Sequence, residues 1–315
     1  MTAAMPGALS DTAFAVRRDA VAAETEALLD RLLASDIQTG EWTRPARLLE
    51  AMRYATLGGG KRLRPLLVVE TAALFGAPRA QALMAGAALE CVHCYSLVHD
   101  DLPAMDDDAL RRGRPTLHRA FDEATAILAG DALLTFAFDV MARPETHPDP
   151  DIRAALVLEL ARAAGLGGMA GGQMLDLAAE GRFGQGRPMT EADVLTLQAM
   201  KTGALLTFAC RIGAILGRVA PDISAEISRF GLALGRAFQV ADDLLDVEGD
   251  ATLVGKATGK DASAGKATLV SLLGVEGAKQ RLAALVAEAE NALQHFGADA
   301  GMLRAIVHFV AARKM

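Results

Sequence analysis

The spacing of apolar residues predicts a chain built of helices. In residues 225–247, apolar side chains recur every three or four positions and form one continuous face of a helix. The sequence shows no alternation of strand and helix patterns of the kind that builds a parallel sheet. Comparable helical spacing is present near residues 15–35, 81–100, 120–142, 151–165, 190–217 and 277–295.

Segments rich in glycine, proline and polar residues separate the predicted helices. These breaks lie at 39–45, 142–150, 180–188 and 249–266. Composition does not shift along the chain, so we expect one large all-helical domain over residues 1–315. Long connections of this kind often carry functional residues.

Composition supports the helical interpretation and narrows the functional classes. Hydrophobic residues make up 52% of the chain but aromatic residues only 4%, a balance that favours helices over strands. The formal net charge of −7 argues against a general nucleic-acid-binding protein, which would need an electropositive surface. A polyanionic ligand would therefore need a locally basic site.

The cysteines and the longest apolar runs indicate where the protein resides. Cys91, Cys94 and Cys210 offer no disulfide framework and suit a reducing compartment. The first two form a C-x-x-C pair, but no second pair is present to complete a zinc site. The N-terminal residues lack the apolar stretch of a secretory signal, and Asp131 and Arg211 interrupt the longest apolar runs. We therefore expect a cytoplasmic protein that is not integral to a membrane.

An acidic segment followed by arginines is the first candidate for chemistry. LVHDDLPAMDDDALRRGRPTLH occupies residues 97–118 and holds five aspartates between Asp100 and Asp108. In the predicted helix before it, His93 and Asp100 share a face. The carboxylates come at the C-terminal end of that helix, where its dipole disfavours negative charge. Magnesium would compensate, because it takes carboxylate oxygens and bridges to phosphates. Taken alone, the segment also fits a solvated acidic turn.

A second acidic segment repeats this arrangement. FQVADDLLDVEGD places four polar residues at positions i, i+3, i+4 and i+7 of a predicted helix: Gln239, Asp242, Asp243 and Asp246. Like charges one turn apart repel, so two such clusters on apolar helices indicate a shared function. Facing clusters of this kind hold metals in helical bundles. The lack of a Glu-x-x-His pattern argues against a di-iron centre and favours hard, oxygen-ligated ions.

Basic residues beside glycines complete the pattern. GGGKRLRP (58–65) places Lys61 and Arg64 shortly after three glycines. Glycine lets the backbone approach an anion closely, and arginine forms forked, charge-assisted bonds to phosphate. Lysines also occur in MKTGALL (200–206) and among the glycines of 249–266. No single segment is decisive, but together with two acidic clusters they predict magnesium-dependent binding of phosphorylated substrates.

These segments resemble the motifs of the trans-prenyl diphosphate synthases, or polyprenyl synthetases. DDLPAMDDDALRRGRPT is similar to the family's first aspartate-rich motif with its trailing arginine pair, and FQVADDLLD to its second. GGGKRLRP, GDALL, GGQMLDL, KTGALL and GKATGKDASAGKAT also match in the family's order, so the resemblance covers roughly residues 50–275. The two-residue insertion Pro103-Ala104 is similar to that of bacterial farnesyl and of geranylgeranyl diphosphate synthases.

The resemblance implies an all-α, single-domain helical bundle of the isoprenoid synthase type around a deep central cavity, usually a homodimer. It implies isoprenoid diphosphates as small-molecule substrates. It also implies a magnesium cofactor, with three ions per active site and manganese as a substitute. The implied magnesium ligands are Asp100 and Asp106, with Asp101 assisting, and Asp242 from the second motif.

The catalytic and substrate-binding residues are implied by their positions in the same motifs. The implied catalytic set is Asp100, Asp101, Asp106, Lys201, Thr202, Gln239 and Asp242. The residues implied to bind the allylic diphosphate are Arg111, Lys201, Gln239 and Lys256. Those implied to bind isopentenyl diphosphate are Lys61, Arg64, His93 and Arg112. Tyr95 resembles the aromatic residue that stops chain growth in bacterial farnesyl synthases, although a core tyrosine with a satisfied hydroxyl is the alternative.

The implied reaction couples isopentenyl diphosphate to dimethylallyl or geranyl diphosphate. Ionisation of the allylic carbon–oxygen bond gives a carbocation, which the isopentenyl double bond attacks before a proton is lost. Farnesyl diphosphate is the expected product and geranylgeranyl diphosphate the alternative. Two other classes stay open: a class I terpene cyclase, which needs one diphosphate site, and a non-catalytic synthase subunit, which tends to lose aspartates. Both aspartate motifs are complete in this chain.

Overall fold

The computed structural model describes residues 10–184, 189–248 and 268–312, and in these ranges the chain is all-α apart from one small hairpin. The hairpin pairs β1 (Leu110–Arg111) with β2 (Arg114–Pro115) in antiparallel register. The expected all-helical fold is confirmed. The helices are α1 (Asp11–Leu32), α2 (Ala46–Thr56), α3 (Leu63–Leu74), α4 (Arg79–Asp100), α5 (Leu117–Ala120), α6 (Glu123–Ala142), α7 (Pro150–Ala164), α8 (Met169–Ala179), α9 (Glu191–Gln198), α10 (Ala204–Leu216), α11 (Pro221–Glu248), α14 (Leu269–Ala292) and α15 (Gly301–Ala311).

Two of the predicted helices are more complex than their spacing indicates. The run near 190–217 divides into α9, a π-helix over Ala199–Gly203, and α10. The run near 277–295 belongs to α14, which begins earlier, at Leu269, and contains a kink at Gly274 with φ of 70°. Periodicity of apolar residues cannot reveal a π-turn, because such a turn displaces the pattern by only one residue.

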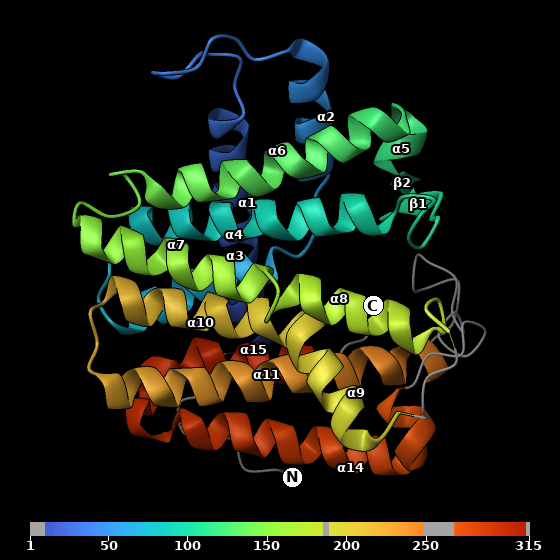
Figure 1. The fold of residues 1–315 in the computed structure, drawn as a ribbon. Coiled ribbons are helices and arrows are strands. Elements are labelled where there is room, and N and C mark those ends of the chain that lie inside the picture. Colours follow the sequence, from blue (N-terminus) through green and yellow to red (C-terminus); the bar gives the residue numbers. More distant parts are fainter. Residues whose placement is uncertain (1–9, 185–188, 249–267, 313–315) are drawn as a thin grey trace.

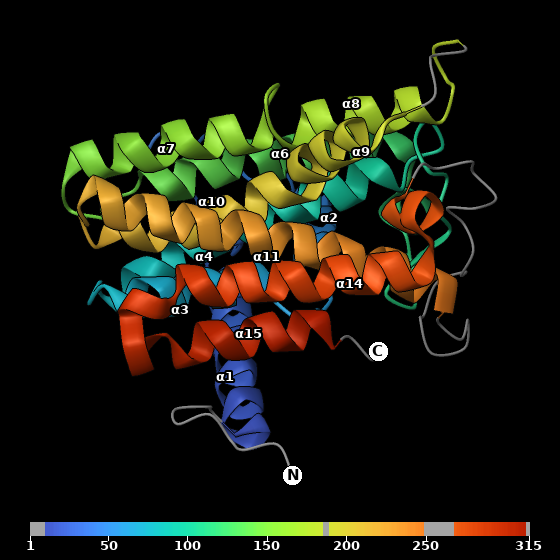
Figure 2. The same cartoon turned by 90° about the horizontal axis from the view of Figure 1, so that it is seen from below.

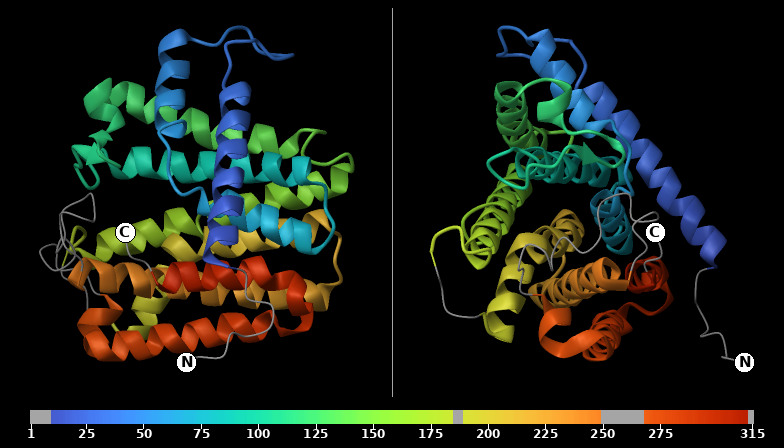
Figure 3. Two further views of the ribbon diagram at one scale, coloured as in Figure 1. Left: turned by 180° about the vertical axis from the view of Figure 1, so that it is seen from behind. Right: turned by 90° about the vertical axis from the view of Figure 1, so that its right-hand side faces the viewer.

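The core lies where the long helices cross. α4 packs between α3 and α6, while α10 packs against α3, α7 and α11, and α11 packs against α14. Most of these helices run side by side, with α6, α7 and α8 on one side of the molecule and α14 and α15 on the other (Figures 1 and 2). Figure 3 (left) views the molecule from behind and shows α1 crossing in front of the other helices at a steep angle. A second, smaller apolar cluster joins α9, α11 and α14.

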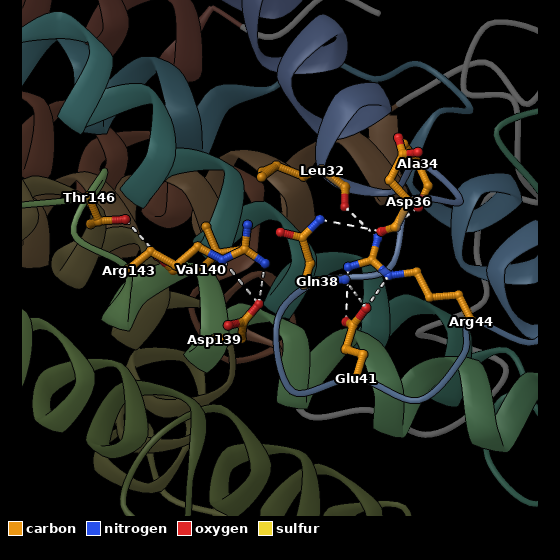
Figure 4. Close-up of polar contacts among 10 residues, drawn as sticks. All are labelled: Leu32, Ala34, Asp36, Gln38, Glu41, Arg44, Asp139, Val140, Arg143 and Thr146. Carbon is orange, nitrogen blue, oxygen red and sulfur yellow. Dashed lines mark hydrogen bonds and ion pairs between the residues drawn. The ribbon is translucent and has the colours of Figure 1, made fainter.

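Short polar contacts fix the connections between helices. Figure 4 shows the connection between α1 and α2, where Arg44 donates to the carbonyl oxygens of Leu32 and Ala34 at 3.2 and 2.7 Å. The same guanidinium pairs with Glu41, whose carboxylate also accepts the backbone N–H of Gln38. The connection has no helix or strand of its own, and these bonds hold it in place. They also satisfy carbonyl oxygens that have no backbone hydrogen-bond donor at the end of α1.

Three segments are long and apolar enough to cross a membrane by length and composition alone: Glu123–Ala142, Pro150–Ala179 and Glu191–Leu216. They correspond to α6, to α7 with α8, and to α9 with α10. α6 packs on α4, and α10 on α3 and α11, as core helices do. Length and composition by themselves do not establish a membrane protein.

The segments with candidate chemistry gather at one end of the bundle. The end of α4 with the β1–β2 hairpin, the end of α8 and the end of α11 all lie at the right-hand end of Figure 1. The view from below agrees, with the same three ends on the right (Figure 2). Helix packing therefore brings together motifs that are far apart in the sequence.

Candidate active site at one end of the bundle

The first aspartate-rich segment folds back on the end of α4. The backbone N–H of Met105 donates to the carbonyl of Leu102 at 2.8 Å, and that of Asp106 donates to the carbonyl of Asp100 at 2.9 Å. The segment between Asp101 and Asp106 is thus a compact turn. As a result, Asp100 and Asp106 lie close enough to repel each other, with Asp106 exposed.

Asp101 is buried and pairs with the hairpin. Its Oδ1 accepts from Nε of Arg111 at 2.9 Å and from the terminal nitrogen of the same guanidinium. Arg111 also lies 3.3 Å from Asp108. Burial raises the pKa of Asp101 and Arg111 opposes that rise. In this structure Asp101 therefore orients Arg111, one of the residues expected to bind the allylic diphosphate.

Among the aspartates of this segment, Asp100 has the pKa that is raised to about 6. Burial raises this pKa, the nearby charges of Asp106 and Asp101 add to the rise, and those of Lys201 and Arg111 oppose it. Since Lys201 belongs to the π-helix, this interaction places the end of α4 beside that helix. Two motifs expected to act on one diphosphate are thus brought together.

A basic cluster surrounds His93 on α4. Burial lowers the pKa of His93 well below its usual range, and the charges of Arg64, Arg112, Arg62 and Arg111 lower it further. His93 is therefore neutral at pH 7. These arginines come from the start of α3 and from the hairpin, so the fold gathers several positive charges around one neutral imidazole. Three of the four residues expected to bind isopentenyl diphosphate lie in this cluster: Arg64, His93 and Arg112.

The glycine-rich turn before α3 contacts the same hairpin. Nη1 of Arg112 donates to the carbonyl of Gly59 at 2.6 Å, and a Cβ at Gly60 would lie 2.6 Å from that nitrogen. Glycine is required there, because its φ of 124° is also unfavourable for other residues. Lys61, the fourth expected residue, is exposed, and its Nζ lies 5.5 Å from the ring centroid of Phe309 on α15.

Arg62 has a structural role instead. Its side chain is fully buried and donates to Glu90 at 2.8 Å and to the carbonyl of Thr56. It therefore ties the glycine turn to α2 and α4. The residue was not among the expected ligands, and its burial agrees with that omission.

The π-helix presents Lys201 and Thr202 between α8 and α11. Nζ of Lys201 donates to Asp176 of α8 at 2.5 Å. A Cβ at Gly172 would lie 2.2 Å from the amide nitrogen of Lys201, so α8 can approach this closely only with glycine there. π-Turns of this kind are frequent at functional sites.

A polar chain links the π-helix to the second aspartate motif. Oγ1 of Thr202 donates to Oε1 of Gln239 at 3.0 Å, and Nε2 of Gln239 donates to Oδ1 of Asp243 at 2.9 Å. Oδ2 of Asp243 accepts from Nε2 of Gln198, also at 2.9 Å. Asp243 and Gln198 are buried, so that end of the polar chain is shielded from water, while Thr202 and Gln239 are half-buried. Asp243 fixes the amide of Gln239, and Gln239 accepts the hydroxyl of Thr202, so the orientation of Thr202 depends on Asp243.

The sequence analysis assigned no role to Asp176 or Gln198, and it placed Asp243 in the second acidic cluster without a separate role. Asp176 lies in the GGQMLDL match and Asp243 in the second motif, so both positions carry a signal in the sequence. Gln198 carries no signal in the sequence, because its role depends on a contact between helices.

The remaining expected residues are placed less tightly. Asp242 is half-buried on α11, one residue before Asp243. Tyr95 is half-buried on α4, and its ring meets that of His99 edge-on at 5.8 Å. That contact neither requires nor excludes a role in limiting chain length. Lys256 lies outside the described residues.

Comparisons with known proteins identify the family. The polyprenyl synthetase family matches residues 45–300. The chain belongs to this family. It is 42% identical over 270 residues to a farnesyl diphosphate synthase of Geobacillus stearothermophilus, covering 85% of this chain and 89% of that one. It is 41% identical to a chloroplastic geranylgeranyl pyrophosphate synthase of Arabidopsis thaliana, over 86% of this chain and 75% of that one.

A solved structure extends the likeness to three dimensions. The apo crystal structure of an FPP/GFPP synthase from Zymomonas mobilis matches with a TM-score of 0.85 and 44% identity. The match covers 96% of this chain and 100% of that one. The expected family and fold class are therefore confirmed, and the chain is a prenyltransferase of this family.

Polyprenyl synthetases of the farnesyl type generally use magnesium, and the residues around Asp100 fit that ion. Asp100 is half-buried; desolvation raises its pKa, the like charges of Asp106 and Asp101 add to that rise, and a divalent cation would offset both effects. Within the described ranges, no three histidine, cysteine, aspartate or glutamate side chains are grouped closely enough to hold a metal. An ion would therefore take further oxygens, which diphosphate and water supply.

An apolar groove of about 540 Å³ lies elsewhere in this polyprenyl synthetase. It is bounded by α2, α6 and the connection shown in Figure 4, and Leu48, Met52 and Phe136 are among its lining residues. None of the expected site residues lines it. The charged cluster, and not this groove, is the candidate active site.

Proposed function

We propose that the protein is a short-chain trans-prenyl diphosphate synthase with farnesyl diphosphate as its main product. One observation carries the proposal: two differently charged clusters stand at the same end of the bundle. An acidic cluster around Asp100 lies beside Lys201, and a basic cluster surrounds neutral His93. Arg111 interacts with both. This arrangement suits one diphosphate bound through metal and another bound by arginines alone.

The acidic cluster would take the allylic diphosphate. Asp100, Asp106 and Asp242 would hold magnesium, which supplies charge neutralisation for the leaving diphosphate when bound. We propose three ions per site, with manganese able to substitute. Lys201 and Arg111 would bind the diphosphate oxygens directly, and both are already oriented by carboxylates, Lys201 by Asp176 and Arg111 by Asp101.

The basic cluster would take isopentenyl diphosphate. Arg64, Arg112 and Lys61 would bind its phosphates, and the neutral imidazole of His93 would accept or donate a hydrogen bond without adding charge. This division explains why the arginines gather around a histidine that stays neutral. Anion binding there would relieve the mutual repulsion of the cations.

Catalysis would then follow from charge and position. The cations stabilise the diphosphate as the allylic carbon–oxygen bond breaks, and the isopentenyl double bond attacks the resulting carbocation. A proton is lost from the coupled product to the departed diphosphate. Thr202 and Gln239, held by Asp243, would line the ionising bond. An apolar surround would exclude the water that quenches such a cation.

Product length rests on Tyr95 and on the relatives. A half-buried tyrosine five residues before Asp100 is suited to close the end of a chain-binding cavity near fifteen carbons. The similar proteins include synthases named for farnesyl, geranylgeranyl and FPP/GFPP products. Geranylgeranyl diphosphate is therefore the second candidate product.

We further propose a cytoplasmic homodimer without nucleic-acid or integral-membrane association. α6, α7 and α8 lie along one side of the molecule (Figures 1 and 2). Large apolar side chains are exposed on these helices and between them, a feature typical of interaction surfaces. They are Ile127, Leu128, Leu158, Leu166, Met174 and Leu175. Sedimentation of the purified protein tests the dimer.

The proposed function is tested by product analysis. Purified protein is incubated with magnesium, labelled isopentenyl diphosphate and each of the dimethylallyl, geranyl and farnesyl primers, and the products are separated by chain length. We expect fifteen-carbon diphosphate from the first two primers and none after chelation. A cyclase would instead consume farnesyl diphosphate without isopentenyl diphosphate. A non-catalytic subunit would bind both ligands and yield no product by itself.

A further inference from the structure

Arg182, just beyond the end of α8, grips the turn between Asp101 and Asp106. Nη1 of Arg182 donates to the carbonyl of Ala104 at 2.8 Å, and Nη2 donates to the carbonyl of Met105 at 2.5 Å. The guanidinium thus binds two successive carbonyls in a fork, directly before Asp106. Nε of the same group donates to Glu180 at 3.2 Å, which fixes the plane of the fork.

The position of Arg182 is itself fixed by the end of α8. The N–H groups of Glu180 and Gly181 donate to the carbonyls of Asp176 and Ala178 at 3.0 Å each, and Gly181 has φ of 81°. A left-handed glycine at this place ends a helix and turns the chain sharply. Arg182 is therefore held in a fixed relation to Asp176, which orients Lys201.

The turn that Arg182 grips determines where Asp106 stands. Three backbone bonds close the turn: the N–H groups of Met105 and Asp107 donate to the carbonyl of Leu102 at 2.8 and 3.1 Å, and that of Asp106 donates to the carbonyl of Asp100 at 2.9 Å. None of them uses the carbonyls of Ala104 and Met105, which Arg182 binds. The repulsion between Asp100 and Asp106 works to open the turn. A clamp on the carbonyls between them opposes that opening. The insertion Pro103-Ala104 thus places an acceptor within reach of Arg182.

We propose that Arg182 is a positioning residue that holds Asp106 beside Asp100 for divalent-metal binding, an inference that rests on the proposed function. The end of α8 would then fix two parts of the site: the turn between Asp101 and Asp106, through Arg182, and the side chain of Lys201, through Asp176. Arg182 itself touches neither metal nor substrate. Its loss should weaken metal binding and leave the chemistry intact once metal saturates.

The test compares Arg182→Ala with a matched control. Arg229→Ala also removes an exposed arginine, whose guanidinium lies 3.3 Å from Glu226 on the same helix. Free Mn²⁺ is measured by electron paramagnetic resonance while each protein is titrated in the presence of inorganic pyrophosphate. We expect about three- to tenfold weaker Mn²⁺ binding in the Arg182 variant, the loss of one to two hydrogen bonds, and none in the control. Arg182→Lys, which can reach one carbonyl, should fall between.

Turnover provides the second measurement. The magnesium concentration for half-maximal rate should rise by the same factor in Arg182→Ala, while the rate at saturating magnesium stays within about twofold of wild type. Unchanged Mn²⁺ binding, or a rate that stays low at every magnesium concentration, would overturn the proposal. A wild-type protein that binds Mn²⁺ but makes no product would refute the proposed function and not the clamp.

Discussion

Asp243→Asn tests the polar chain that orients Thr202. Both carboxylate oxygens of Asp243 accept an amide N–H at 2.9 Å, one from Gln239 and one from Gln198. An asparagine offers only one oxygen, so while both glutamines keep their present orientation, one glutamine N–H faces another donor. Relieving that clash requires the Gln198 amide to turn over, which gives up its present N–H bond. Each bond to a charged acceptor contributes about 1.5–3 kcal/mol. Removing the carboxylate returns part of its desolvation cost, so we expect a net loss of about 2 kcal/mol.

The assay is urea unfolding of wild type and variant at pH 7. The midpoint should fall while the slope stays constant, because the exposed surface on unfolding does not change. Turnover should fall about tenfold, since Gln239 then holds Thr202 in place less firmly.

A second substitution makes the test specific. Gln198→Glu combined with Asp243→Asn keeps the net charge and exchanges the roles of the two side chains. The amide at position 243 then donates to the carboxylate at position 198, where the wild type has the reverse. We expect the pair to recover about half of the lost stability, whereas Gln198→Glu alone puts two carboxylates together and destabilises. If Asp243→Asn unfolds at the wild-type urea concentration with unchanged turnover, the hydrogen-bonded chain does not support the site.

Three further predictions address the site directly. Asp100→Ala or Asp242→Ala should lower turnover by about 10²- to 10³-fold or more, with an unchanged far-ultraviolet circular dichroism spectrum; full activity in either would remove the metal assignment. Tyr95→Ala should lengthen the product, seen by chromatography, and an unchanged fifteen-carbon product would exclude its role as a floor. The unfolded chain protonates His93 near pH 6.5 and the folded chain resists, so the contribution of His93 to stability should fall as pH drops from 7 to 5.5, by up to about 1.4 kcal/mol per unit. Asp100, whose pKa is raised to about 6 in the folded chain, shifts stability in the opposite direction over the same range. His93→Gln should remove the contribution of His93 to the pH dependence of urea unfolding, and a pH dependence equal to that of wild type would contradict the half-buried, neutral imidazole.

Much of the architecture could be predicted from apolar spacing. The predicted ranges 81–100, 120–142 and 225–247 correspond to α4, α6 and α11 within a few residues. These helices carry long, regular apolar faces, which is the strongest local signal that a sequence offers. Five of the helices in the described residues were not predicted: α2, α3, α5, α8 and α15. α3 is buried nearly all round and α8 is short and glycine-rich, so neither has a clear apolar stripe.

The acidic and basic motifs indicated which residues matter but not how they are arranged. Asp101 and Asp100 are adjacent and look alike in sequence, yet one pairs with Arg111 and the other faces Lys201. The difference arises from which side of the helix end each carboxylate occupies. Likewise, Asp243 is buried and accepts from Gln198 and Gln239, whereas Asp242, one residue before it, is half-buried. Such assignments depend on contacts between helices and cannot be read from spacing.

The π-helix has a consequence for how this chain tolerates change. Val194, before it, packs in the cluster with α11 and α14, while Leu205, after it, packs in the main core. One extra residue in a helix turns everything beyond it by about 100°. The π-helix Ala199–Gly203 therefore rotates the apolar face of α10 relative to that of α9, so that each faces its own apolar cluster. Lys201 lies within this π-helix. Deleting a single residue here would leave each core intact in itself and rotate one against the other. A one-residue deletion in the π-helix would therefore displace the site residues Lys201 and Thr202. A one-residue deletion between α1 and α2 would displace none of the expected site residues.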